Sequence, residues 1–188
     1  MIYLDNSATT KPCIPAVEAM TKAMTENWGN PSALYGFGID TARELRNARH
    51  LGASAMGAEP ERIFFTSGGT EADNWAIFGT VKRLGKRGKH LITTAMEHHA
   101  ILNCFKELEN QGYEVTYLKP DSMGRISLEE LQSALRKDTI LVSIMMVNNE
   151  VGSVMPISKM QIRTFFIFII CLLFLFICRN RAGNGYSV

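Results

Sequence analysis

Residues 64–74 read Phe-Phe-Thr-Ser-Gly-Gly-Thr-Glu-Ala-Asp-Asn, and this stretch decides the fold. The apolar run at 63–66 predicts a short buried strand. Two glycines then predict a sharp turn, because a backbone without Cβ atoms can turn tightly and approach a ligand. Thr70 is the predicted N-cap of a helix over 71–84, with apolar positions at 72, 75, 76 and 79. This arrangement directs unpaired N–H groups at one point and therefore predicts an anion site, most simply for a phosphate.

Two common phosphate motifs are absent from this stretch. No Gly-Lys-Ser/Thr follows the glycines, so the stretch is not a Walker loop, and the chain contains no G-x-G-x-x-G dinucleotide fingerprint. A glycine turn before a helix is often only a turn, and that structural interpretation stays open at this point.

Strands and helices are predicted to alternate after residue 63. Strands at 90–94, 114–118 and 140–147 alternate with helices at 99–111 and 127–137, and two helices precede them, one opened by Pro15 and one ending near Met56. The alternation predicts an α/β fold, with a mostly parallel sheet and helices on both faces. Ligands of such sheets bind beyond the carboxyl ends of the strands.

Three polar loops follow predicted strands, at 67–70, 95–99 and 148–150. If the strands are parallel, Gly69, Thr70, His98 and Asn149 lie along one edge of the sheet. Backbone amides for a phosphate, an imidazole and a side-chain amide would suit a planar cofactor that carries a phosphate. Each loop also has a structural interpretation, in which His98 is a cap or surface residue and Asn149 belongs to a turn. The adjacent His98 and His99 do not form a metal-binding pattern, and no metal site is predicted.

Composition excludes several classes of function. The 188 residues include 20 Lys and Arg against 18 Asp and Glu, for a net charge of +2, without the basic stripe that nucleic-acid binding requires. The cysteines, Cys13, Cys104, Cys171 and Cys178, show no C-x-x-C spacing. Reduced thiols in a cytoplasmic protein are therefore expected.

The C-terminal part differs from the rest in composition. Residues 165–178 are fourteen consecutive apolar residues between Arg163 and Arg179. A membrane-spanning helix needs about 20 residues, so membrane association through residues 164–178 is a weak expectation. We expect residues 1–158 to form one domain and residues 159–188 to be an unrelated apolar tail.

Residues 2 to about 158 resemble the N-terminal part of cysteine desulfurases, pyridoxal-phosphate enzymes of the class V aminotransferase group. Six matching stretches carry the resemblance in the order of that family: 3–10 (YLDNSATT), 29–32 (GNPS), 65–74 (FTSGGTEADN), 97–102 (EHHAIL), 112–118 (GYEVTYL) and 147–152 (VNNEVG). The fold that this resemblance implies is an incomplete large domain of a pyridoxal-phosphate transferase.

The resemblance also implies roles for particular residues. Gly69 and Thr70 would hold the phosphate of pyridoxal phosphate, His98 would stack on its pyridine ring, and Asn149 would lie beside the ring hydroxyl. The family takes sulfur from L-cysteine, leaving alanine and a persulfide used for iron–sulfur cluster or thio-cofactor assembly. Members are homodimers, and scaffold or sulfur-acceptor proteins are possible partners.

The sequence departs from the family after Ser158. The family continues to an Asp that pairs with the pyridine nitrogen, a Ser-x-His-Lys stretch with the Schiff-base lysine, and a loop with the persulfide cysteine. This sequence contains none of them, and no cysteine occupies the catalytic position. We therefore expect no catalytic residues here and no turnover of cysteine by this polypeptide alone.

Three interpretations remain open at this stage. The first is a truncated cysteine desulfurase whose tail has no function. The second is a fragment of a related class V aminotransferase or a selenocysteine lyase. The third is a non-catalytic paralogue that the apolar segment anchors to a membrane.

Overall fold

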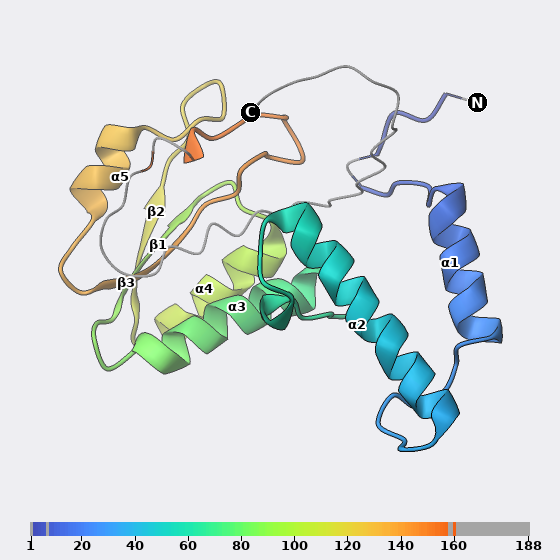
Figure 1. Cartoon of the computed structure of the whole chain (residues 1–188). Helices are drawn as coiled ribbons and strands as arrows, with labels where there is room; N and C mark the ends of the chain where they lie inside the picture. The colour runs from blue at the N-terminus through green and yellow to red at the C-terminus, as the bar shows by residue number, and fades with distance from the viewer. Residues whose placement is uncertain (1, 7, 158–159, 161–188) are drawn as a thin grey trace. The chain divides into compact units, whose positions relative to one another are not determined.

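A computed structural model of the chain describes residues 2–6, 8–157 and 160, in two units (Figure 1). The first unit extends to Phe65 and the second begins at Thr66. The predicted domain boundary after residue 158 and the predicted tail lie outside the described residues, apart from Met160. Among the described residues, no helix has both the length and the apolar character needed to cross a bilayer.

Two helices and one short 3-10 turn make up the described part of the first unit. Helix α1 spans Ile14–Thr25, helix α2 spans Gly36–Met56 and η1 spans Pro60–Arg62. Pro15 lies in the first turn of α1, where its missing N–H costs nothing. Helix α2 ends at Gly57, whose φ of 63° is left-handed, the usual role of glycine after a helix. Both predicted helices are thus confirmed.

The strand predicted at 63–66 is wrong. These residues are irregular, and Phe64 and Phe65 are 62% and 54% exposed. Arg49 of α2 holds part of the segment, because its guanidinium donates to the Ile63 carbonyl at 3.0 Å and lies 5.4 Å from the centre of the Phe65 ring. A strand forms only where another strand completes its ladder, and no described segment pairs with 63–66.

The second unit is built on a three-stranded parallel sheet. Strands β1 (His90–Thr94), β2 (Glu114–Leu118) and β3 (Thr139–Ser143) lie in the order β2-β1-β3. Both pairings are parallel, which confirms the predicted α/β fold. The first two strands match their predicted bounds, whereas β3 ends four residues before the predicted end at 147.

Helices cover both faces of this sheet. Helices α3 (Gly69–Leu84) and α4 (His99–Asn110) pack on one face, and α5 (Leu128–Ala134) packs on the other (Figure 1). Alternating strand residues serve the two layers, since Leu91 and Leu141 face α3 and α4 while Ile92 and Val142 face α5. The two apolar layers fix the sheet between the helices.

The buried face of α3 differs from the predicted one. The helix buries Asp73, Ile77, Thr80, Val81 and Leu84. Trp75, assigned to the apolar face from the sequence, is 57% exposed. The face toward the sheet is set by the branched residues farther along the helix, and it carries an aspartate into the interior.

Helix α5 is shorter than the predicted helix 127–137. Its N-cap is Ser127, whose hydroxyl accepts from the Glu130 N–H at 3.2 Å, as the capping spacing predicts. The helix stops at Ala134 because the next residues turn toward β3, where the Arg136 N–H donates to the Thr139 hydroxyl at 2.8 Å. The end of α5 is thus tied to the start of its own following strand.

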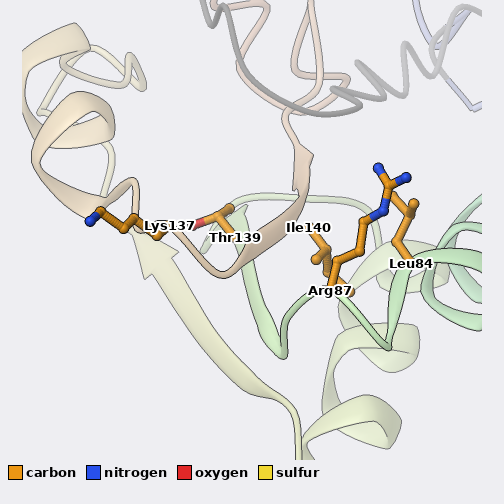
Figure 2. Close-up of a pocket in the computed structure, with 5 residues that line it drawn as sticks. All are labelled: Leu84, Arg87, Lys137, Thr139 and Ile140. Carbon is orange, nitrogen blue, oxygen red and sulfur yellow. The ribbon is translucent and has the colours of Figure 1, made fainter.

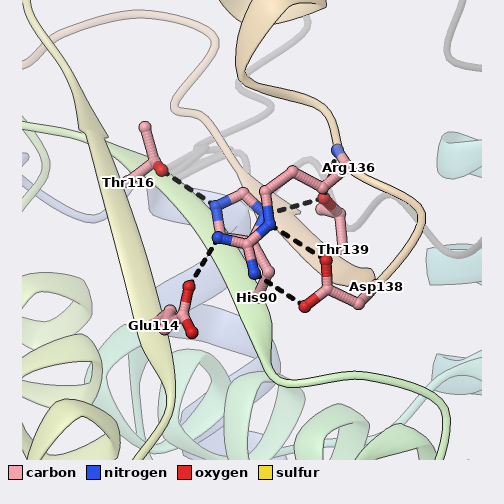
Figure 3. Close-up of polar contacts among 6 residues, drawn as sticks. All are labelled: His90, Glu114, Thr116, Arg136, Asp138 and Thr139. Atoms are coloured by element: carbon pink, nitrogen blue, oxygen red, sulfur yellow. Dashed lines mark hydrogen bonds and ion pairs between the residues drawn. The ribbon is translucent and has the colours of Figure 1, made fainter.

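Ion pairs connect the amino ends of the outer strands of the sheet. The Arg136 guanidinium bonds both carboxylate oxygens of Asp138, at 2.9 and 2.7 Å, and also the Glu114 carboxylate at the start of β2 (Figure 3). These groups are substantially exposed, so the ion pairs contribute little individually to stability. Their geometry nevertheless connects β2 to β3 across β1.

His90 lies buried beneath this cluster. Its Nδ1 is 2.7 Å from the Thr139 hydroxyl and its Nε2 is 2.8 Å from the Thr116 hydroxyl, so one imidazole joins all three strands (Figure 3). Burial lowers the pKa of His90, with the Arg136 charge as the next contribution. A neutral ring matches this environment, because one nitrogen can donate and the other accept while each hydroxyl rotates to suit.

Gly88 permits the close approach of the chain before β1 to the chain before β3. A Cβ at this position would lie 2.7 Å from the carbonyl carbon of Asp138. The same carbonyl accepts from the His90 N–H at 3.2 Å, so backbone occupies the space that a side chain would need. The start of the β1–β3 pairing therefore requires glycine at position 88.

We predict that Gly88→Ala destabilises the chain by about 1–3 kcal/mol, because the new methyl group meets backbone that cannot yield without separating the strands. Denaturant unfolding followed by circular dichroism measures the change. Gly79→Ala in α3 is the matched control, since a Cβ there meets nothing within 4 Å. That control is expected to stabilise the chain by roughly 0.5–1 kcal/mol through helix propensity. Equal effects of the two substitutions would contradict this account.

Candidate functional site

The first turn of α3 presents backbone N–H groups to open space. Its N-cap is Gly68, in an extended conformation with φ 170° and ψ 179°, and the helix begins at Gly69. The prediction that Thr70 is the N-cap is therefore wrong by two residues; Thr70 is the second residue of the helix and its side chain is exposed. A Cβ on Gly68 would meet nothing within 4 Å, so the space before the helix is open.

Glu71 organises the turn that leads into this helix. Its carboxylate accepts from both the Ser67 N–H and the Ser67 hydroxyl, each at 2.6 Å. These hydrogen bonds lower the pKa of Glu71, with the hydroxyl as the larger cause. The carboxylate thereby uses the donors of Ser67 and leaves the amides of Gly69 and Thr70, which the helix cannot satisfy internally, for another acceptor.

His98 ends the second loop and caps helix α4. Its Nδ1 accepts from the Ala100 N–H at 3.1 Å, and the ring is exposed. An accepting Nδ1 places the proton of a neutral ring on Nε2 and fixes how the ring leaves the helix. The structural interpretation of His98 as a cap is confirmed, and the cap leaves the ring face accessible. The neighbouring His99 ring lies 6.4 Å away, edge-on.

The third loop depends on Asn148 rather than on the predicted Asn149. Asn148 is buried, and its amide donates to the Met96 carbonyl at 3.0 Å. Its side-chain oxygen accepts from the N–H groups of Glu150 and Val151, each at 2.9 Å. Asn149 is half-buried and donates to the exposed Glu150 carboxylate at 3.0 Å. Sequence reasoning noticed the Asn-Asn pair and assigned no role to its first member.

Two hydrogen bonds join the second loop to the third. The Glu97 carboxylate accepts from the Met145 N–H at 2.8 Å, and Asn148 reaches Met96 as described. Because Glu97 takes the Met145 N–H, the chain leaves the sheet at Ser143, which explains the early end of β3. The carboxyl ends of β1 and β3 are neighbours in the parallel sheet, so both loops lie at the same edge.

The first turns of α3 belong to the same edge. Asp73, on the buried face of α3, is close enough to His98 and Glu97 for their charges to interact. Residues 69 and 70 precede Asp73 by one turn. The structure therefore brings the second and third loops to one edge of the sheet, with the first turns of α3 near them. The reasoning from parallel strands applies to the second and third loops and not to residues 67–70, because no described strand precedes those residues.

Two carboxyl groups, those of Asp73 and Glu97, are buried at this edge. Burial raises the pKa of Asp73 to about 6, an effect that the nearby His98 charge opposes. Burial likewise raises the pKa of Glu97 to about 7, against the hydrogen bonds from Met145 and Thr94, and the charge of Asp73 raises it further. Sequence analysis missed both groups.

Cys104 is not placed to act as a nucleophile. Its thiol is buried and donates to the Ala100 carbonyl at 3.0 Å. Burial raises the pKa of this thiol to about 11, so the reactive thiolate is scarce at neutral pH. Cys171 and Cys178 lie outside the described residues.

The residues at this edge fit a phosphate-bearing ring. The amides of Gly69 and Thr70 belong to the first turn of α3, at the positive end of a helix dipole and next to open space at Gly68, which suits a phosphate. An accessible imidazole and a carboxamide follow on the other two loops. Among the described residues, no group of three or more His, Cys, Asp or Glu could hold a metal ion.

Two hollows of the second unit lie away from this edge. One, of about 470 Å³, is at the opposite edge of the sheet, lined by Leu84, Arg87, Lys137, Thr139 and Ile140 (Figure 2). Another, of about 540 Å³, lies beside α5, between Lys119 and Pro156. Neither of these two hollows includes a residue of the predicted site.

We predict that Asn148→Ala destabilises the chain by about 2–3 kcal/mol, because its truncation leaves the Met96 carbonyl and two loop N–H groups without their partner. Asn149→Ala is the matched control, with an expected cost below about 0.5 kcal/mol for an amide that bonds an exposed carboxylate. Thermal or denaturant unfolding of both variants measures the difference. A larger cost for Asn149→Ala would reverse the assignment.

Comparisons with known proteins show the family of this chain. A family model described as "Aminotransferase class-V" matches residues 2–165. The cysteine desulfurase IscS of Methanosarcina thermophila is 51% identical over 158 residues, which are 84% of this chain and 39% of that protein. Cysteine desulfurase 2 of Trichormus variabilis is 47% identical over 163 residues, which are 87% of this chain and 41% of that protein.

Solved structures give the same result. A NifS-like protein superposes with a TM-score of 0.85 at 37% identity, covering 88% of this chain and 47% of the other. A structure of SspA in complex with cysteine superposes with a TM-score of 0.78 at 38% identity, covering 84% of this chain and 46% of that one. The chain spans about two fifths of the length of the curated relatives it matches. Since the family model covers all three loops, the chain belongs to the class-V aminotransferase family, and the cysteine desulfurases of that family are the proteins to part of which it corresponds.

Proposed function

We propose that this chain is the coenzyme-phosphate and ring-binding portion of a cysteine desulfurase, whose whole protein takes sulfur from L-cysteine. The observation that carries the proposal is that the second and third loops meet at one sheet edge, where the Glu97–Met145 and Asn148–Met96 hydrogen bonds join them, with the first turns of α3 near them. The cysteine in the complex with SspA supports the substrate assignment.

In this proposal Gly69 and Thr70 hold the phosphate of pyridoxal phosphate. The Gly68 backbone leaves the approach to their amides open, and the Glu71 carboxylate is occupied by Ser67. The exposed Thr70 hydroxyl adds a donor. A phosphate at this position interacts favourably with the N-terminal end of α3.

His98 and Asn149 contact the coenzyme ring in this proposal. The bond from Ala100 to Nδ1 of His98 holds the imidazole, so its face can stack on a planar ring. Asn149 releases Glu150 and places its amide beside the ring hydroxyl. When bound, pyridoxal phosphate supplies an electron sink for chemistry at the substrate α-carbon, while these residues bind and orient it.

The reactive groups of the family lie outside this sequence in the same proposal. The sequence contains no Ser-x-His-Lys stretch, and Cys104 is buried. In this proposal the Asp for the ring nitrogen, the Schiff-base lysine and the persulfide cysteine of the family have no counterpart among the 188 residues. We propose that the chain by itself binds without turnover. The cytoplasmic location, homodimer and sulfur-acceptor partners of the family are proposals for the whole protein.

We predict that pyridoxal phosphate binds the chain more tightly than pyridoxal, because the α3 amides recognise the phosphate. Thr70→Ala should weaken binding of the phosphate form about tenfold, the usual effect of one hydrogen bond to a charged group. Fluorescence quenching measures both affinities. Thr21→Ala, at an exposed threonine of α1, is the control. Equal affinities for pyridoxal and its phosphate would contradict the site.

The variant His98→Asn distinguishes the role of His98 as a helix cap from its proposed role in stacking on the coenzyme ring. Asparagine is a favoured N-cap, so helix α4 should keep its stability while the stacking surface is lost. We predict an unchanged unfolding midpoint and at least a several-fold weaker binding of pyridoxal phosphate, measured by the same quenching. His99→Asn should change neither quantity. Undiminished binding by His98→Asn would exclude His98 from the ring contact.

The chain with pyridoxal phosphate and L-cysteine is expected to release no more sulfide than the coenzyme alone, because it lacks the lysine and the thiolate. Methylene-blue detection of sulfide in the presence of a reductant checks this, with a complete cysteine desulfurase as the positive control. Sulfide release above the coenzyme background that disappears in Thr70→Ala would show that this chain is itself active.

A further inference from the structure

Glu97 is a buried carboxyl that the proposed chemistry does not use. It is 5% exposed and belongs to the loop that carries His98. One oxygen, Oε1, accepts from the Thr94 hydroxyl at 3.0 Å and from the Met145 N–H at 2.8 Å. The other, Oε2, is buried and has no partner among the described residues.

Asp73 is a second buried carboxyl at the same edge. It is 4% exposed on the inner face of α3, and its Oδ2 also lacks a partner in the described part of the chain. Its charge acts on Glu97, on Cys104 of α4 and on His98. These are the titratable groups that face the pair from α3, α4 and the loop between β1 and α4.

Two buried carboxylates with unbonded oxygens cannot both hold a negative charge cheaply. A buried charge without donors costs far more than a neutral acid, and adjacent carboxyls therefore share protons. Burial and the neighbouring carboxylate raise the pKa of Glu97 to about 7, against about 6 for Asp73. The first proton that this pair of carboxyls binds therefore resides mostly on Glu97.

We propose that Glu97 is a positioning residue that acts as a neutral acid: its Oε1 ties the His98 loop to the Asn149 loop, its proton lies on Oε2, and Asp73 keeps the negative charge that faces His98. This role deepens the proposed function, on which it rests, because it explains how two ring-contacting side chains from separate strands are held in one relative position. A charged Glu97 would place a second anion beside Asp73, with no donor for Oε2.

The protonation state is tested directly by carbon NMR of the Glu97 carboxyl in the whole chain without coenzyme. The resonance is assigned by its disappearance in Glu97→Gln. We expect a titration midpoint near pH 7, and a lower midpoint in Asp73→Asn, because that variant removes the adjacent charge. A midpoint between about 4 and 5, the ordinary range of glutamate, would overturn the proposal.

The positioning role is tested by hydrogen exchange at two amides. The Met145 N–H donates to Glu97, and the Ala100 N–H donates to His98. Glu97→Gln keeps an acceptor and a donor without charge, so protection of both amides should persist. Glu97→Ala should lose about tenfold in protection at Met145, and a smaller amount at Ala100. Loss of protection in Glu97→Gln equal to that in Glu97→Ala would overturn the neutral role, and unchanged protection in Glu97→Ala would overturn the tie.

Stability against pH supplies a readout that packing alone would not move. A carboxyl whose pKa is raised by folding stabilises the protein when protonated, and this contribution is lost as pH rises from the unfolded value near 4.5 through about 7. Glu97→Gln, always neutral, should therefore unfold at a higher denaturant concentration than the wild type at pH 8, with a smaller difference at pH 5. A difference independent of pH would contradict the proposal.

The matched control is Glu44→Gln, at an exposed carboxylate of α2. It should change neither the exchange rates nor the pH dependence. If Glu97→Ala does not fold, the NMR midpoint and the pH profile of Glu97→Gln still decide the matter. These measurements use no coenzyme, so weak binding of pyridoxal phosphate would count against the proposed function and leave the role of Glu97 to be judged separately.

Discussion

The parallel pairing of β1 with β3 places the ends of both strands at one edge, and a single carboxyl then joins the loops that leave them. Glu97 reaches from the end of β1 to the Met145 N–H beyond β3. Asn148 makes a second bond between the same two loops, because its side-chain amide donates to the Met96 carbonyl. These reciprocal bonds cross between segments 48 and 52 residues apart in the chain, so they fix a geometry that neither loop could specify alone.

The polar interior at this edge contrasts with the apolar interior behind it. Along the face toward α3 and α4, Leu91 is followed by Thr93 on β1, and Leu141 by Ser143 on β3. Thr93 and Ser143 are register partners, and both hydroxyls are buried without a partner among the described residues. With Asp73 they form a polar layer above the hydrophobic core. Natural proteins keep such unsatisfied groups where they serve a function, which agrees with a binding edge above them.

The sequence could predict the features that arise from local patterns. Within the described residues, periodicity and capping located the five α-helices and the three strands of the sheet, and the rule for parallel strands brought the loops that carry His98 and Asn149 to one edge. The strand expected at 63–66 was wrong because strand formation needs a distant partner, which no local pattern can guarantee. Thr70 was misassigned as a cap because an extended glycine serves as well.

Other features could not be read from the residues in order. Nothing distinguishes Asn148 from Asn149 until their side chains are placed, and an acidic residue in the loop after a strand, such as Glu97, usually lies in solvent. Asp73 offered a weak signal, since it lies four residues before Ile77 on a helix whose buried face continues through Leu84. The roles of the site residues toward the coenzyme are proposals that binding measurements will decide.

The close contact of Gly88 with Asp138 is a second feature that fixes how β1 and β3 lie relative to each other, at the end of the sheet remote from Glu97. It sets the separation of β1 and β3 at their amino ends, and five-residue strands are too short to absorb a wider spacing before their carboxyl ends. The hydrogen bond from the Met145 N–H to Glu97 therefore depends on the backbone contact between Gly88 and Asp138 at the opposite ends of the same two strands. A larger residue at position 88 would therefore disturb the hydrogen bond between Glu97 and Met145, although position 88 is remote from the loops that this bond joins.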